Sequence, residues 1–584
     1  MGVSTWGTWL GLSALAIACG SAESEADSAG RAGASGAANT GGGGAAATGG
    51  VESGGVVSTS AGASAGMGGS ATSDGAAGHG IEEGGTAGEA STPVQAGASD
   101  DGLGGDGFGG DGFGGAAGSS AAAGASGTQE DGSGNSTGPH WFTFNHDQGN
   151  FAYDVSRYPD TSALFKLTSK SNGSQNPLGP WSPDGRSLLY FDYQDVYCRD
   201  MTQVTPGPAR LIAAAPPALD LSISVDRLSW SGDSGSVALA TGSSLLAFDP
   251  RQDNPTFQPI TTSIRFAAWA PAGNHLLYRD ATGFYVVAVN AGQPSVSQPL
   301  DITVFRSWSP DGRYLAASSG SKLLLVDVTG ATLVTTTVTS TAGTPQVTSA
   351  RFSPDAQGLA FIGMLSRPKA DLYYVRLDNL GAPQAITNGL PASAGVANFT
   401  FWSPDSHWLG FTINDGLKTL WQAVNVSSEP PGAPFPIQPQ ATTSYSWLTK
   451  RPNTFVSYTN SANARFVTYD LSTPEIDPVP VLKAASTLSA LSPRGDWLAA
   501  DDGDAIAMRN LDTLAPAADI RVRLSSSPNQ LAWSPDGQFL SIITSQQGYV
   551  EGLIRVAGST ASTPLLLNSG SGANIVGYWQ PVFR

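Results

Sequence analysis

The sequence predicts an all-β chain whose ordered part is a β-propeller of four-stranded blades. Three observations predict this fold. A short motif recurs with a mean spacing near 44 residues, each copy carries a turn signal of the Ser-Pro-Asp-Gly type, and strand-like runs follow each turn. This period is typical of propeller blades, in which each repeat supplies one four-stranded sheet.

The repeat is clearest in three copies that read Trp-Ser-Pro-Asp-Gly and begin at Trp181, Trp308 and Trp533. Degraded copies preserve the register, with the first position held by a large apolar residue. Counting all copies gives about ten units, whose anchor residues are Trp181, Trp230, Trp269, Trp308, Phe352, Trp402, Trp447, Leu491, Trp533 and Trp579.

Each repeat unit predicts one strand, a tight turn and three further strands. Proline presets the backbone of the turn, aspartate bonds to nearby backbone groups, and glycine accepts a positive φ. In the unit anchored at Trp308, the later strands are expected at Tyr314–Ser318, Lys322–Val328 and Thr332–Thr337.

The anchor tryptophans are interpreted as packing residues between neighbouring blades. Their flat rings can fill the wedge there, while the indole N–H can still reach a carbonyl. The motif aspartates recur with the period, whereas a catalytic residue is needed only once. We therefore assign to turns the residues Asp184, Asp311, Asp355, Asp405 and Asp536.

The two ends of the ordered part together predict one composite blade. The chain ends on a first strand at Asn574–Pro581, and it begins with three strands at Trp141–Phe144, Asn150–Val155 and Leu164–Leu167. Joining them would remove the open edges that invite aggregation. Nine internal blades and this one make ten, arranged as one large ring or, alternatively, as two propellers.

The repeat resembles that of the TolB-like propellers, relatives of WD-repeat domains in which a Ser-Pro-Asp-Gly turn follows the first strand of each unit. The resemblance covers nearly all of residues 140–584. It implies the fold but little about function, because propellers host diverse roles. TolB carries a small α/β domain ahead of its propeller, and no such domain is expected here.

Residues 1–18 predict an export signal. Leu10–Ala18 is too short an apolar run for a membrane span, and Leu15–Gly20 resembles the lipobox of bacterial lipoproteins, in which Cys19 would be lipidated. The alternative is an ordinary secretory signal. We expect an exported protein of the bacterial envelope, lipid-anchored and at the outer membrane, with Cys198 left as a lone cysteine.

Residues 19–139 predict a disordered, acidic Gly/Ala/Ser-rich linker. Between Gly20 and Gly138 the chain holds 38 of its 73 glycines, and 14 acidic residues against one basic residue. Such a composition cannot bury enough apolar surface to offset the entropy of ordering. The remaining part, residues 140–584, is nearly neutral with 33 acidic and 28 basic residues, which argues against a nucleic-acid partner.

The sequence offers only weak candidates for catalytic or metal-binding residues. His140, His146, His275 and His407 lack the spacing of paired metal ligands. The sharpest acidic cluster is formed by Asp501, Asp502 and Asp504, which could hold Ca²⁺ but also fits a polar hairpin turn. We therefore expect no cofactor, with calcium as the alternative.

Three functions remain open. The one we favour is a non-enzymatic, lipid-anchored, monomeric propeller that binds an envelope protein or a polysaccharide. The alternatives are a propeller hydrolase or lyase with its site in the central funnel, and a structural protein of envelope assembly. Clustered charged residues in the funnel would favour an enzyme, and an exposed aromatic face would favour binding.

Overall fold

The computed structural model describes residues 140–581 apart from short stretches. These stretches are residues 147, 169–177, 193–194, 215–227, 242, 340–345, 367–368, 382, 388–389, 391–393, 415–418, 438–441, 460–464, 474–478, 487, 513–518, 525, 545–549, 559 and 570–576. The predicted signal, Cys19 and the linker lie outside the described residues. In the part that is described, no helix has the length and apolar character needed to cross a membrane.

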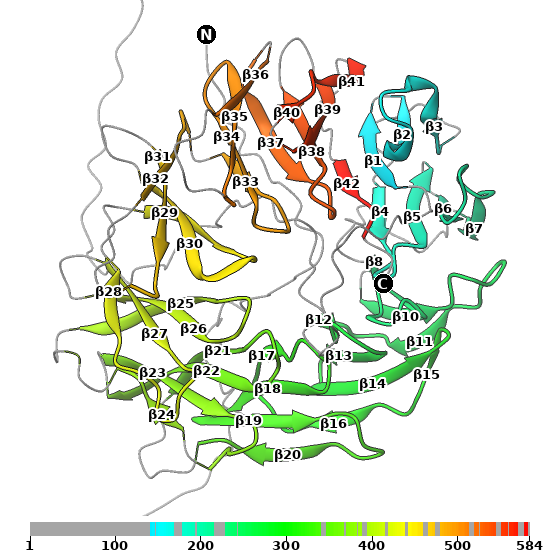
Figure 1. The fold of residues 1–584 in the computed structure, drawn as a ribbon. Helices are drawn as coiled ribbons and strands as arrows, with labels where there is room; N and C mark the ends of the chain where they lie inside the picture. The colour runs from blue at the N-terminus through cyan, green and yellow to red at the C-terminus, as the bar shows by residue number, and fades with distance from the viewer. Residues whose placement is uncertain are drawn as a thin grey trace, which may run out of the picture. The chain divides into compact units, whose positions relative to one another are not determined.

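The described strands form ten antiparallel sheets, numbered here as blades 1 to 10 and arranged as a propeller (Figure 1). Blades 2, 3 and 5 each run in chain order from the innermost strand A to the outermost strand D. Their bounds are β4 (Leu178–Trp181), β5 (Ser187–Asp192), β6 (Asp195–Asp200) and β7 (Arg210–Ala213); β8 (Leu228–Trp230), β9 (Val237–Thr241), β10 (Ser244–Phe248) and β11 (Gln258–Thr261); and β17 (Val304–Trp308), β18 (Tyr314–Ser319), β19 (Lys322–Asp327) and β20 (Val334–Thr337).

Blades 6 to 9 follow the same order. Their bounds are β21 (Gln346–Phe352), β22 (Gly358–Ser366), β23 (Lys369–Arg376) and β24 (Gln384–Ala385); β25 (Gly395–Trp402), β26 (Trp408–Asn414), β27 (Thr419–Asn425) and β28 (Phe435–Ile437); β29 (Thr442–Leu448), β30 (Arg451–Thr459), β31 (Arg465–Asp470) and β32 (Val479–Lys483); and β33 (Ser489–Leu491), β34 (Trp497–Asp501), β35 (Ala505–Asn510) and β36 (Ile520–Arg523).

Blades 4 and 10 differ because two short strands share the outermost position and pair with the same strand C. Blade 4 contains β12 (Phe266–Trp269), β13 (His275–Arg279), β14 (Phe284–Asn290), β15 (Gln293–Pro294) and β16 (Gln298–Leu300). Blade 10 contains β37 (Pro528–Trp533), β38 (Phe539–Thr544), β39 (Val550–Ala557), β40 (Thr560–Ala561) and β41 (Leu565–Ser569).

Blade 1 confirms the predicted closure by both ends of the ordered part. The C-terminal strand β42 (Gly577–Trp579) is its strand A and pairs with β1 (Trp141–His146), with Phe142 opposite Trp579. Gln580 extends the closure: its backbone N–H donates to the Trp141 carbonyl at 3.0 Å, and its side-chain oxygen accepts from the Trp141 N–H at 2.8 Å. The blade is completed by β2 (Gly149–Asp154), the 3₁₀ turns η1 (Val155–Arg157) and η2 (Thr161–Ala163), and β3 (Leu164–Lys166).

The hydrophobic core is divided among the junctions between blades. Ten clusters of buried apolar side chains are present among the described residues, and each cluster joins two consecutive blades. One of them packs Phe142 and Trp579 of blade 1 against Phe539 and Leu553 of blade 10. Since every junction has its cluster, the ten blades close into one ring, and the alternative of two propellers is wrong.

The anchor tryptophans pack toward the preceding blade, and in six blades the indole also hydrogen-bonds to it, as predicted. In five blades the indole N–H donates to the carbonyl of the residue just before the preceding anchor. These bonds are Trp230 to Pro180 (3.0 Å), Trp269 to Ser229 (3.1 Å), Trp308 to Ala268 (3.4 Å), Trp533 to Ala490 (2.9 Å) and Trp579 to Ala532 (3.2 Å). In these five blades the indole therefore reaches the same position of the preceding blade.

The indole of Trp181 is linked to the equivalent carbonyl of the preceding blade through a hydroxyl group that lies between them. Its indole N–H donates to Thr143 Oγ1 at 3.2 Å, and this hydroxyl donates to the Tyr578 carbonyl at 3.1 Å. Tyr578 directly precedes the anchor Trp579. The acceptor at the junction of blades 1 and 2 is therefore in the same position as at the other junctions, but two hydrogen bonds lead to it instead of one.

The bond pattern predicts different costs for removing two anchor indoles. Trp533→Phe leaves the carbonyl of Ala490 without this donor, whereas the Nε1 of Trp402 has no hydrogen-bond partner among the described residues. We expect Trp533→Phe to lower the free energy of unfolding by about 1 to 2 kcal/mol more than Trp402→Phe, because a buried acceptor loses its donor. Denaturant unfolding of both variants measures the difference, and equal losses would contradict the role of the indole bond.

Candidate functional site

The two ends of the ring carry different connections. Since neighbouring strands are antiparallel, the A–B turns and C–D connections share one end, called here the turn face. The B–C turns and D–A connections share the other end, called here the rim face. Figure 1 shows strands such as β12, β17 and β33 toward the centre and β7, β20 and β36 at the periphery.

The Ser-Pro-Asp-Gly turn is held by a closed set of hydrogen bonds, as blade 5 illustrates. The hydroxyl of Ser309 donates to the Asp311 carboxylate at 2.5 Å and accepts from the Tyr314 N–H at 2.8 Å. The same carboxylate oxygen accepts from the Arg313 N–H at 3.1 Å. Equivalent serine-to-aspartate bonds occur at Asp184, Asp233, Asp355, Asp405 and Asp536, so the motif aspartates serve the turns.

A second repeat on the turn face was missed by the sequence reasoning. At the end of strand C, an Asp or Asn accepts from both the N–H and the hydroxyl of the Ser or Thr two residues on. Asp327 accepts from the Thr329 N–H at 3.0 Å and from its hydroxyl at 2.6 Å, while Val328 between them is buried. The signal is Asx-apolar-Ser/Thr, and it recurs at Asp154, Asp200, Asn425 and Asp470.

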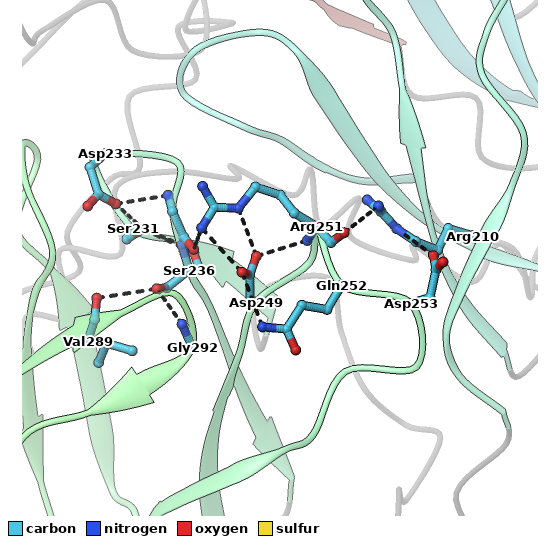
Figure 2. A network of polar contacts seen from close by, with 11 residues as sticks. Arg210, Ser231, Asp233, Ser236, Asp249, Arg251, Gln252, Asp253, Val289 and Gly292 are labelled. Carbon is cyan, nitrogen blue, oxygen red and sulfur yellow. Dashed lines mark hydrogen bonds and ion pairs between the residues drawn. The ribbon is translucent and has the colours of Figure 1, made fainter.

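Figure 2 shows the densest polar network of blade 3, centred on the nearly buried carboxylate of Asp249. This carboxylate accepts from the backbone N–H and from Nε of Arg251, each at 2.9 Å. Burial alone would raise the pKa of Asp249, but the hydrogen bonds from Arg251 outweigh it and lower the pKa below its usual value. The carbonyl of Arg251 in turn accepts from Nη1 of Arg210 at 2.7 Å.

The same network reaches blade 4 through Ser236. Its hydroxyl donates to the Val289 carbonyl at 3.2 Å and accepts from the Gly292 N–H at 3.0 Å (Figure 2). Blades 2, 3 and 4 are therefore joined by hydrogen bonds of polar side chains. This network stabilises the ring.

The proposed calcium cluster does not gather its carboxylates. Asp501 is buried and accepts from the Ser486 hydroxyl at 2.7 Å and from the Gly503 N–H at 2.9 Å. Asp502 forms an ion pair with Arg521. The segment is the hairpin turn between β34 and β35, and among the described residues no group of three or more His, Cys, Asp and Glu side chains is placed to hold a metal ion.

The histidines and the described cysteine lie apart from one another. His407 pairs with Asp405 of its own turn at 3.0 Å, and His140 lies 3.7 Å from Asp536. Burial lowers the pKa of His275 on β13. Cys198 on β6 is buried, and burial raises the pKa of its thiol. His146 lies at the end of β1, and Cys19 is outside the described residues.

An unusual surface lies on the rim face at the junction of blades 4 and 5. It consists of Arg265, Phe266, Arg279, Val304 and Phe305, and we call it the arginine–phenylalanine patch. Phe266 and Phe305 are half-buried with ring centroids 5.7 Å apart, and Val304 is 40% exposed. Both arginines are exposed.

In the part of the chain that the structure describes, neither arginine of this patch has a charged partner. Within the described residues, the side chains of Arg265 and Arg279 form no hydrogen bond or ion pair. Arg279 stands opposite Phe266 in the β12–β13 register, and its guanidinium lies 5.3 Å from the centroid of the Phe284 ring. No periodic signal in the sequence marks this patch, because Arg265 and Arg279 belong to one blade only.

Comparison with known proteins finds similarity to solved structures alone. No family model matches the chain, and no curated protein matches it. Among solved structures, a eukaryotic initiation factor is 12% identical over 76% of this chain and 99% of that chain, with a TM-score of 0.47. A putative TolB from Agrobacterium tumefaciens is 16% identical over 42% of this chain and 90% of that chain, with a TM-score of 0.25.

A putative dipeptidyl aminopeptidase IV from Bacteroides ovatus is also similar. It is 12% identical over 68% of this chain and 62% of that chain, with a TM-score of 0.36. Similarities at this level of identity and superposition carry no argument about activity, substrate or partner.

The close contact between turns of blades 4 and 5 predicts that two glycines of blade 5 differ in the stability lost on substitution by alanine. Both have positive φ, +71° at Gly312 and +58° at Gly320. A Cβ at 312 would lie 2.2 Å from the Ala272 carbonyl oxygen of blade 4, whereas a Cβ at 320 would meet nothing within 4 Å. We expect Gly312→Ala to cost about 2 to 4 kcal/mol and Gly320→Ala about 1 kcal/mol. Thermal unfolding of the pair checks this, and similar losses would contradict the close contact between turns.

Proposed function

We propose that this protein is a non-enzymatic propeller of the bacterial envelope that binds a partner on the rim face of its ring. One observation carries the proposal: the arginine–phenylalanine patch exposes two unpaired guanidinium groups beside half-buried aromatic rings. Arginine and aromatic residues are enriched at protein interfaces and among the residues that dominate binding energy. On the turn face, by contrast, the motif carboxylates are bonded within their own turns.

The proposal includes the envelope location and the lipid anchor at Cys19. It rests on the apolar run and lipobox-like segment that end at this cysteine, and on the Gly-rich linker that follows it. A Gly-rich coil of this length has an r.m.s. span on the order of 60 Å, which would let the ring reach partners well away from the membrane surface.

Affinity capture tests the binding function. The full-length chain, immobilised through a C-terminal tag, should retain a saturable partner from a bacterial envelope extract, and the retained protein or polysaccharide should bind again after purification. The same preparation should leave glycan and peptide substrates intact. Hydrolysis or elimination of such substrates by the purified chain would contradict the proposal and favour a propeller enzyme.

Membrane fractionation tests the anchor. Cys19→Ala should move the protein from the membrane fraction to the soluble fraction, because the thiol that carries the lipid is missing. Cys198→Ala is the matched control and should leave the distribution unchanged. A Cys19→Ala variant that stays with the membrane would show that the lipobox interpretation is wrong.

A further inference from the structure

The arginine–phenylalanine patch also indicates the chemistry of its partner. This step rests on the proposed binding function and makes it specific. We propose that the patch binds an acidic, extended peptide segment of a partner protein, with carboxylates pairing with Arg265 and Arg279 and an apolar side chain packing over Phe266, Phe305 and Val304.

The charge of the patch favours an anionic partner. Many basic side chains of the ring have an acidic neighbour, as in the pairs Arg313–Asp327, Arg376–Asp378 and Lys450–Asp496, with N to O distances of 2.9 to 3.0 Å. Arg265 and Arg279 lack such a neighbour, although they belong to adjacent strand ends and the Arg265 N–H donates to the Arg279 carbonyl at 2.8 Å. Each of these two guanidinium groups can form a charge-assisted hydrogen bond with an anion.

Within the described residues, the acidic residues nearest in sequence form no ion pair with the two arginines. Asp280 directly follows Arg279, but its carboxylate accepts from the Thr282 N–H at 2.8 Å, from the Thr282 hydroxyl at 2.6 Å and from the Gly283 N–H at 3.2 Å. These bonds tie the carboxylate into its own B–C turn. Asp301 is exposed and forms no ion pair within the described residues.

The apolar part of the patch fits a side chain of the partner. Phe266 and Phe305 come from strands A of two neighbouring blades and lie at the margin of the apolar cluster between them. Val304 at the start of β17 is an exposed apolar side chain. An apolar centre flanked by guanidinium groups is the usual composition of an interface hot spot.

The backbone favours an extended peptide over a polysaccharide. In the described sheets, β12 and β17 are terminal strands, each paired on one side only. A terminal strand presents N–H and C=O groups to which an extended peptide can add in the manner of another strand. A polysaccharide could pair with the arginines but would not use these groups in register.

Fluorescence anisotropy of the full-length protein tests the inference. The probe is a fluorescein-labelled octapeptide of alternating glutamate and valine, which combines negative charge, apolar side chains and strand propensity. We expect binding that weakens as salt is added, and a loss of affinity of at least about tenfold in the double variant Arg265→Glu/Arg279→Glu, because both charge pairs become repulsive. Arg523→Glu, an exposed arginine at the end of β36, is the matched control and should bind as the wild type does.

Three outcomes decide between the alternatives. Equal affinity of the peptide for the wild type and the double variant, or no binding to either, overturns the inference. Binding of polygalacturonate that depends on both arginines, without binding of the peptide, also overturns it and assigns the patch to an acidic polysaccharide. If the double variant still captures the partner from envelope extract as well as the wild type does, the binding function stands and only this patch is wrong. Thermal unfolding confirms that all three proteins are folded.

Discussion

The contact between neighbouring blades is the constraint on which the rest of this structure depends. A four-stranded blade has apolar side chains on both faces, so it is stable only when a blade packs on each side. Ten apolar clusters meet this need at ten junctions, and the last is made by strands from opposite ends of the described chain. Closure therefore removes the two blade faces that an open array would expose to water.

The indole-to-carbonyl bond sets how far each blade is displaced along its neighbour. Where the acceptor residue is Pro180, Ser229, Ala268, Ala490 or Ala532, its small side chain leaves room for the ring of the next anchor. The arc from blade 5 to blade 9 departs from this pattern, since Phe352 and Leu491 have no indole.

Other polar contacts bridge the blades of that arc. Arg306 Nη1 of blade 5 donates to the Thr348 carbonyl of blade 6 at 2.7 Å, and Trp408 Nε1 of blade 7 donates to Asn453 of blade 8 at 2.8 Å. From blade 8, Lys450 pairs with Asp496 of blade 9 at 3.0 Å. The packing requirement is thus constant around the ring, while the polar contacts that accompany it vary. By contrast, the two arginines of the patch form no ion pair within the described residues.

The sequence by itself determined the blade unit, the number of units and the closure, because a motif that must pack in the same way in every blade recurs at a regular spacing. It also placed the motif aspartates in turns. Only the tertiary structure decided that the units form one ring, that Asp501 and Asp502 bond to separate partners, and that Phe266 lies beside Phe305 of the next blade. Each of these contacts occurs at one place in the ring and is not repeated in the other blades. A repeating sequence pattern therefore cannot predict them.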